Sequence, residues 1–458
     1  MSTEQSSGRG PEWQAAVAAQ DAAVERLAEA AARIDVDEAP RLPGGFAAGA
    51  LAAGIKPSGR PDLSVVLVTT PEPASAAGTF TSNRVQAAPV RLSRAHLAAT
   101  GGAPADGLPP HGTARAVVVT AGSANAATGP DGDADQLAIA GFLASAAGCA
   151  AEQTLHASTG LIGTRLPVER VAAGIASLVP AGLSATDTAL AEVGRAMMTT
   201  DTRLKAASAV VALPAPGGMR QVRVSGVVKG VGMIHPGMAT MIALVLTDAT
   251  VAPGTLAALL RPAVALTFDQ LSVDGDMSTN DTVLALASGA AGADPVEPGT
   301  PAAAELGAAI AAVCRSLARQ QAADGEGATC RITCRVSGAV DLADARAVSR
   351  AVVRSSLVKA AVHGRDPNWG RIAAAAGSAR RPDGSPVSVD PESLRITLAG
   401  TPVFAGAPLA FDAPSVSAAM AAPDVVVEVD LGMGRATGEA WGCDLTEAYV
   451  RENAEYAT

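Results

Sequence analysis

Residues 229–248 read KGVGMIHPGMATMIALVLTD, and the chain changes there from a glycine-rich loop to an apolar run. The glycines and the proline of the first part favour turns over regular structure. The run that begins at Met241 predicts a short buried strand. The Walker spacing of a phosphate-binding loop is absent and no helical pattern follows, so these glycines do not indicate a phosphate cradle.

Thr240 stands at the junction, directly after the small residue Ala239. Strain in the loop could press the Thr240 hydroxyl against the carbonyl of Ala239 and move the acyl group from nitrogen to oxygen. Hydrolysis would then release Thr240 as a new N-terminus, whose α-amino group, with a reference pKa of about 7.7 to 8.0, could act as base for its own hydroxyl. A threonine at the start of a strand is more often structural, so the residues alone leave both interpretations open.

On both sides of this stretch, short β-branched runs alternate with alanine-rich helical segments, which predicts an α/β or α+β fold. Strands are expected at 64–70, 116–120, 221–228, 243–247, 328–336 and 425–431. Helices are expected at 11–35, 134–147, 167–178 and 342–362. Glycine-rich turns begin near Pro40, so we expect a main domain from residue 41 and an N-terminal extension, residues 1–40, with an amphipathic helix.

The composition disfavours several classes of protein. The chain has 458 residues, of which 48% are hydrophobic, so it can bury one or two large cores. A formal net charge of −10 without a basic, aromatic stripe argues against nucleic-acid binding and favours small-molecule partners. The sequence offers neither a long apolar run nor an apolar signal core at its polar start, so we expect no membrane span and a cytoplasmic location.

Five scattered cysteines do not resemble a disulfide framework. Only Cys330 and Cys334 are close enough to be considered as metal ligands, and the alternation around them places both thiols on the buried face of a strand. We therefore expect core thiols and no metal site.

Lysine is rare in this chain: among 34 lysines and arginines, lysine occurs only at positions 56, 205, 229 and 359. A compact ammonium group fits tight pockets that exclude guanidinium, although chance survival on the surface is the alternative.

Residues 229–241 resemble the signature of the ornithine acetyltransferase family, also called glutamate N-acetyltransferases, which reads Lys-Gly-x-Gly-Met-Ile-x-Pro-x-Met-Ala-Thr-Met. The resemblance continues in ordered blocks over roughly residues 41 to 458, and so many blocks in order are highly specific. The further blocks are 54–56, 78–83, 87–90, 158–163, 198–202 with Lys205, 273–282, 324–328, 364–371, 441–446 and 453–458.

This resemblance implies an αββα-type sandwich of the self-cleaving amidohydrolase and acyltransferase kind, with a smaller α/β subdomain. The precursor would break between Ala239 and Thr240. Residues 1–239, which comprise the extension and the N-terminal fragment 41–239, would stay together with fragment 240–458, and two cleaved pairs would form a heterotetramer. Thr240 would take the acetyl group of N-acetylornithine, carry it as an ester and pass it to glutamate. Such a two-step exchange needs no metal or bound cofactor.

The resemblance also assigns roles near the nucleophile. Thr159 and Gly160 match the family's oxyanion pair, which stabilises the charge formed in each step. A Ser-Thr-Gly turn is otherwise common. Lys229 matches the family's substrate-binding lysine, which suits a carboxylate, and Lys205 is a weaker second candidate.

Four further residues match substrate contacts. Within the block 198–202, Thr200 is preferred over the other threonines, with a structural turn as the alternative. Glu326 matches the acid that receives the amino group of ornithine, although it could be an ordinary turn acid. Asn453 and Thr458 match contacts from the C-terminus, so the chain end should fold back into the site. The block 366–371 with Trp369 is expected to be architectural.

The chain departs from the family at residues 120–129. The family usually reads Asn-Ser-Gly-Asn-Ala-Asn-Ala-Cys-Thr-Gly, whereas this chain reads TAGSANAATG and lacks two amides and a thiol in a segment expected near the active site. Two alternatives to acetyl exchange therefore stay open. One is an acyltransferase of specialised metabolism, and the other is an amidohydrolase or aminopeptidase of the same fold.

Overall fold

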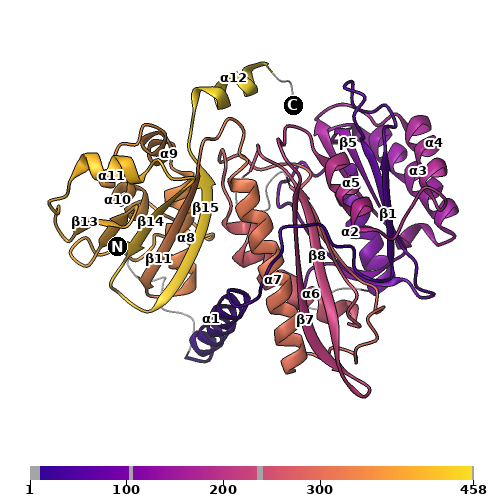
Figure 1. The fold of residues 1–458 in the computed structure, drawn as a ribbon, viewed down its shortest axis with the longest axis horizontal. Helices are drawn as coiled ribbons and strands as arrows, with labels where there is room; N and C mark the ends of the chain where they lie inside the picture. The colour runs from indigo at the N-terminus through magenta and orange to yellow at the C-terminus, as the bar shows by residue number, and fades with distance from the viewer. Residues whose placement is uncertain (1–10, 103–106, 235–240, 456–458) are drawn as a thin grey trace, which may run out of the picture.

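The computed structural model describes the backbone of residues 11–102, 107–234 and 241–455, and their side chains from residue 21 onward (Figure 1). The predicted nucleophile Thr240, the preceding Ala239 and the C-terminal Thr458 lie outside the described residues. The two flanks of the cleavage segment, Ile234 and Met241, are described and buried.

A four-stranded sheet and a six-stranded sheet form the middle of the larger unit. The first has the order β1-β2-β5-β6 and consists of β1 (Phe46–Leu51), β2 (Leu63–Val68), β5 (Ala116–Ser123) and β6 (Thr154–Leu161). The second has the order β4-β3-β10-β9-β8-β7 and consists of β4 (His111–Ala114), β3 (Ala74–Phe80), β10 (Thr282–Ala287), β9 (Ile242–Thr247), β8 (Gly218–Lys229) and β7 (Lys205–Ala215). Both contain the strands expected from the β-branched runs.

Helices cover the outer faces of both sheets. α3 (Gly129–Ala147) and α4 (Val168–Leu178) bury Ile139 and Ile175 against the four-stranded sheet. α6 (Pro253–Leu266) and α7 (Pro301–Ala322) do the same on the six-stranded sheet. Between the sheets, aliphatic side chains meet in a separate core, to which α2 (Ala88–Gly101) and α5 (Asp187–Met197) contribute. The larger unit is therefore the expected αββα sandwich.

A smaller α/β unit follows the sandwich in sequence and lies beside it (Figure 1). Its sheet has the order β13-β12-β14-β11-β15. It consists of β11 (Arg331–Ala339), β12 (Arg395–Leu398), β13 (Thr401–Ala405), β14 (Asp424–Asp430) and β15 (Ala436–Cys443), with α8 (Leu342–Arg354), α9 (Ser356–His363), α10 (Trp369–Gly377) and α11 (Ala413–Ala419). Trp369 stacks on Phe404 within this unit, at 4.9 Å between ring centroids. This placement agrees with an architectural role for the block 366–371.

Two single helices complete the fold. α1 (Pro11–Ala31), from the N-terminal extension, lies along α7, and its Ala31 joins the core of the six-stranded sheet. Asp37 of the extension pairs with Ser208 at the edge strand β7. α12 (Glu447–Glu455) extends over the junction of the two units, close to the C-terminus (Figure 1). The described part of the extension, residues 11–40, thus packs against the larger unit.

The structure corrects two sequence expectations. The single helix expected at 342–362 is two helices, α8 and α9, which meet at Ser355 in an extended conformation with φ −62° and ψ 115°. Cys334 is buried in the core of the smaller unit as expected, but Cys330 precedes β11 and is only partly buried. All five cysteines are free.

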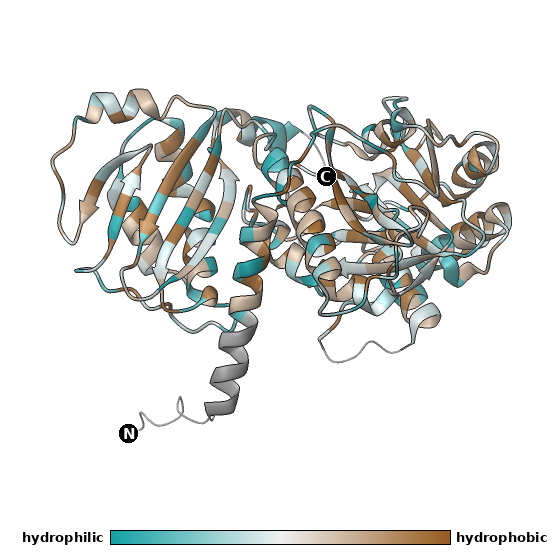
Figure 2. Cartoon of the chain, turned by 60° about the horizontal axis from the view of Figure 1, so that its bottom comes forward, coloured by the Kyte–Doolittle hydropathy of each residue, from teal (hydrophilic) through white to brown (hydrophobic). Residues whose placement is uncertain are grey.

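One described helix, α7, is long and apolar enough to cross a membrane by length and composition alone. Its most apolar window is 67% buried inside the fold, where it packs between α1, α6 and the six-stranded sheet. Figure 2 shows that apolar residues are concentrated along strands and packed helices elsewhere in the fold as well. The apolar surface of α7 is therefore explained by core packing.

Candidate active site

A cavity of about 450 Å³ lies where the four-stranded sheet, the end of β8 and α12 meet. Apart from the weaker candidate Lys205, all the site residues expected from the sequence that the structure describes line this one cavity: Thr159, Gly160, Thr200, Lys229, Glu326 and Asn453. They come from five separate segments of the chain. Gly232 and Met233, which precede the cleavage segment, line it as well.

Thr159 and Gly160 lie near the end of β6, beside the neighbouring strand β5. Gly160 pairs with Gly122, and both residues have strongly positive φ angles of +124° and +122°. A Cβ atom at Gly160 would lie 2.4 Å from the carbonyl carbon of Gly122, so the strands can approach this closely only with glycine there. Thr159 is buried, and its Oγ1 accepts a hydrogen bond from Lys229 Nζ at 3.1 Å.

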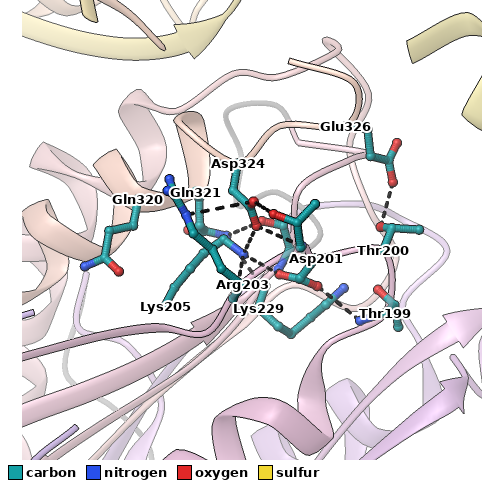
Figure 3. A network of polar contacts seen from close by, with 12 residues as sticks. Thr199, Thr200, Asp201, Arg203, Lys205, Lys229, Gln320, Gln321, Asp324 and Glu326 are labelled. Atoms are coloured by element: carbon teal, nitrogen blue, oxygen red, sulfur yellow. Dashed lines mark hydrogen bonds and ion pairs between the residues drawn. The ribbon is translucent and has the colours of Figure 1, made fainter. Parts of the chain in front are cut away.

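Next to Lys229 lies a buried cluster of charged side chains (Figure 3). Lys205 is fully buried, and its Nζ lies 2.7 Å from Asp201 and 2.5 Å from Asp324. Lys205 does not line the cavity, and its charge is already paired with the protein carboxylates Asp201 and Asp324 rather than left for a substrate carboxylate. Its position suits a structural ion pair better than a substrate contact, so Lys229 is the lysine that reaches the cavity.

The charges of this cluster act on one another. Burial lowers the pKa of Lys229, although Asp201 opposes the shift. Burial alone would raise the pKa of Asp201, but Lys229 and Lys205 outweigh it and hold the pKa below its usual range. Asp201 also accepts hydrogen bonds from the backbone amides of Thr199 and Gly230. An ionised Asp201 therefore fixes both the loop before β7 and the end of β8.

Glu326 connects three segments at the rim of the cavity. Its two oxygens accept hydrogen bonds from Thr200 Oγ1 at 2.7 Å and from Asn453 Nδ2 at 2.9 Å. The hydroxyl of Thr202 bonds to Asp324 instead. Thr200, and not Thr202, therefore contacts Glu326, the acid predicted to bind the amino group. Glu326 is only 8% exposed, so an ammonium group would find a carboxylate with little competition from water.

Sequence reasoning assigned no role to several polar residues of the cavity. Asn83, Asp274, Thr279, Asn280 and Tyr449 line it. The first four lie in blocks that carry the family resemblance, so the signal was present without a role attached. Burial raises the pKa of Asp274 to about 6, although backbone amides of the segment 233–234 and of Asp276 donate to it. Ala124, from the segment that departs from the family, also lines the cavity.

Asp281 lies beside the C-terminal flank of the cleavage segment. Its Oδ1 accepts a hydrogen bond from the backbone amide of Met241 at 3.0 Å, whereas its Oδ2 is buried and without a partner among the described residues. Burial raises the pKa of this carboxyl well above its usual value. In the described parts of the chain, His, Cys, Asp and Glu form no cluster of three that could hold a metal ion.

Comparisons with known proteins point in one direction. The sequence profile of the ArgJ family matches residues 47–458. The arginine biosynthesis bifunctional protein ArgJ of Thermus thermophilus is 46% identical over 420 residues, which cover 92% of this chain and 100% of that protein. Its counterpart in Deinococcus radiodurans is 44% identical, over 91% of this chain and 98% of that protein. The solved ornithine acetyltransferase of Mycobacterium tuberculosis, complexed with ornithine, is 35% identical, with 44% of this chain and 97% of that chain covered and a TM-score of 0.38.

Proposed function

The chain belongs to the ArgJ family, and from this premise we infer that it is an acetyltransferase of arginine biosynthesis. It moves the acetyl group of N-acetylornithine to glutamate. The observation that carries the assignment to this chain is the gathering of Thr159, Gly160, Thr200, Lys229, Glu326 and Asn453 around one cavity next to both flanks of the cleavage segment.

The proposed first event is self-cleavage. The Thr240 hydroxyl attacks the carbonyl of Ala239, the peptide bond becomes an ester, and water hydrolyses the ester to leave a free amino group on Thr240. In turnover, this amino group takes the hydroxyl proton while the oxygen attacks the acetyl carbonyl of N-acetylornithine. The proton then passes to the leaving amine, ornithine departs, and the acetyl ester on Thr240 is attacked by the amino group of glutamate. Release of N-acetylglutamate restores the free hydroxyl.

The contacts of Thr159 support its proposed role at the oxyanion. A hydroxyl has one proton and two lone pairs. Because Lys229 Nζ donates to Thr159 Oγ1 at 3.1 Å, the proton of that hydroxyl is left to donate elsewhere. Loss of one oxyanion donor typically lowers the rate by about 100- to 1000-fold. Lys229 also brings a positive charge to the cavity, where it can attract the carboxylate of either substrate.

Glu326 supplies the complementary negative charge. Thr200 and Asn453 hold its two oxygens from different sides, so the carboxylate is oriented before the substrate arrives. The amino group of ornithine that is not acetylated would bind here, and Thr458 would complete the site from the chain end. Because Lys229 and Glu326 carry opposite charges and both line the cavity, it can distinguish the two ends of an amino acid with a cationic side chain.

We further propose a cytoplasmic location and a heterotetramer of two cleaved pairs. Five free cysteines suit a reducing compartment. Analytical ultracentrifugation of the purified protein tests the assembly, and a mass equal to one cleaved pair would contradict it.

Intact mass under denaturing conditions tests the cleavage. We expect two fragments that part between Ala239 and Thr240 in the wild type and one full-length chain in Thr240→Ala. A single wild-type species would refute self-cleavage, and a cut in both proteins would indicate ordinary proteolysis.

Product analysis tests the transfer. Incubation with N-acetylornithine should release ornithine in quantity only when glutamate is present. Equal release without glutamate would identify a hydrolase. The absence of ornithine from both reactions, despite cleavage, would point to an acyltransferase with another substrate.

A further inference from the structure

A second cavity, of about 870 Å³, lies between the smaller unit and the sandwich and has no part in the proposed reaction. Arg346, Arg350 and Arg354 of α8 line one side, and Arg380, which follows α10, lines another. We name this cavity the arginine pocket. Its volume falls within the range of small-molecule sites, about 300 to 1000 Å³.

The three arginines of α8 form a row because of their spacing. Residues four apart lie on one face of a helix, and the row from Arg346 to Arg354 spans roughly 12 Å along the axis. The opposite face of α8 packs Val348 and Val352 into the core of the smaller unit. Apolar packing therefore fixes the helix and leaves its charged face toward the cavity.

These guanidinium groups have few partners. Among the described residues, those of Arg350, Arg354 and Arg380 make no hydrogen bond or ion pair. Arg346 donates to the carbonyl of Ala265, while its Nε is buried without a partner. The neighbouring Arg381, by contrast, is paired with two aspartates. Like charges at a spacing of four residues repel each other, so the row of arginines destabilises the helix. A bound anion would relieve this repulsion.

We propose that the arginine pocket binds a small molecule through a diphosphate group or two adjacent phosphates. Four arginines and one acid, Asp269, line the pocket, which gives the lining a formal charge of +3. Two phosphate groups carry on the order of three to four negative charges, and each can accept paired hydrogen bonds from a planar guanidinium. The arginines are spread over roughly 12 Å of the helix, so they can contact several phosphate oxygens at once, whereas a single carboxylate would reach fewer of them.

Burial strengthens this inference. It lowers the pKa of Arg346, and it also lowers the pKa of Arg350, where the charge of Arg346 adds to the shift. Small uncharged residues, among them Ala347, Ala351 and Ser378, also line the pocket, so its charge comes from the four arginines and Asp269. Charge that is partly withdrawn from water binds an anion more strongly than exposed charge.

The pocket adjoins the candidate active site through one residue. Met277 lines both cavities, and its carbonyl accepts a hydrogen bond from Asn83 Nδ2 at 3.1 Å. Asn83 lines the active-site cavity. A ligand in the arginine pocket would therefore contact a residue that also shapes the acetyl-transfer site. The binding proposal itself does not depend on that reaction.

Calorimetric titration of the full-length protein with inorganic pyrophosphate tests the proposal. We expect saturable binding with one ligand per chain, weakened at least tenfold in R350Q/R354Q. The control is R395Q, an exposed arginine of the same unit outside the pocket, which should bind as the wild type does. No saturable binding, or equal binding by wild type and double variant, would overturn the proposal.

Two further arms make the outcome specific. R354Q alone changes an exposed side chain, so it keeps the test valid if the double variant fails to fold, and it should also weaken binding. Citrate has a similar charge without phosphorus. Citrate binding as tight as that of pyrophosphate would contradict the phosphate assignment, and weaker binding by tenfold or more would support it.

Discussion

Glu326 is the buried carboxylate that we propose binds the free amino group of N-acetylornithine. In Glu326→Gln the side chain keeps its shape and can still accept from Thr200, but its charge is gone. We expect KM for N-acetylornithine to rise by about ten- to a hundredfold, which corresponds to about 1.4 to 2.8 kcal/mol, typical of a hydrogen bond to a charged group. Steady-state kinetics at saturating glutamate measures this. Glu447→Gln, an exposed acid outside the cavity, is the control, and equal KM values in both variants would contradict the role of Glu326.

Asp274 predicts a pH dependence of stability. Its folded-state pKa is about 6, whereas the unfolded value is near 3.8, so the folded protein holds this proton more tightly. Between these two values the folded state binds more protons, and stability is therefore lost as pH rises from about 4 to about 6. We expect the unfolding free energy of the wild type, relative to Asp274→Asn, to fall by roughly 2 kcal/mol over this range. Urea denaturation at several pH values measures the difference, and a difference that stays constant with pH would refute the shift.

At the residue scale, the family motifs indicated Thr159, Lys229 and Glu326, and the structure brings these three residues to one cavity. Their roles stay predictions. Asp274 and Asp281 were missed as special residues, since their shifted pKa values arise from burial by segments far away in the chain. Lys205 was only a weaker second candidate for a substrate contact, and the scarcity of lysine could not distinguish such a contact from the buried ion pair that the structure contains.

At the scale of elements, the close approach of β5 and β6 makes a sharp prediction. Gly160→Ala places a Cβ 2.4 Å from the backbone of Gly122, at a φ of +124° that L-residues rarely adopt. We expect a loss of stability of about 2 kcal/mol or more and a severe loss of activity. Gly141→Ala is the matched control, because its Cβ would meet no atom within 4 Å on helix α3. That variant should gain up to about 1 kcal/mol. Thermal unfolding of both proteins measures the contrast, and similar shifts would contradict the packing described.

Each of the six strands and four helices expected from the alternation of β-branched and alanine-rich segments overlaps an observed element, because hydrophobic period reflects which faces are buried. Other elements, such as β7 and α7, were not expected. The break at Ser355 was missed because the sequence has no glycine or proline there. Ser355 ends α8 and caps α9, with its side chain accepting from the amide of Val358. Strand order was beyond reach from periodicity, since β10 pairs with β3, a strand from a much earlier part of the chain. Only the family resemblance indicated the sandwich.

At the scale of the whole molecule, the two fragments on either side of the proposed cleavage site both contribute strands to the same sheet. In the six-stranded sheet, β9 and β10 follow residue 240, and they lie between β3 and β8, which precede it. Lys205 and Asp201, which precede the cleavage site, form an ion pair with each other. Lys205 also forms an ion pair with Asp324, which follows the cleavage site. Backbone ladders and a buried ion pair therefore cross between the two fragments at the centre of the fold.

This sharing predicts how the cleaved protein unfolds. The fragments should stay together in native buffer, because separating them would expose both edges of the central β9–β10 pair and leave buried charges unpaired. Unfolding, however, releases two chains from the cleaved wild type and one from uncleaved Thr240→Ala. By mass action, a tenfold rise in protein concentration should stabilise the cleaved form by about 1.4 kcal/mol more than the uncleaved form. Urea midpoints at several concentrations measure this difference. Dissociation of the proposed assembly of two pairs would add to the concentration dependence of the cleaved and the uncleaved protein alike. Identical concentration dependence in both would therefore mean that the fragments do not separate on unfolding or that cleavage has not occurred, and intact mass distinguishes these two outcomes.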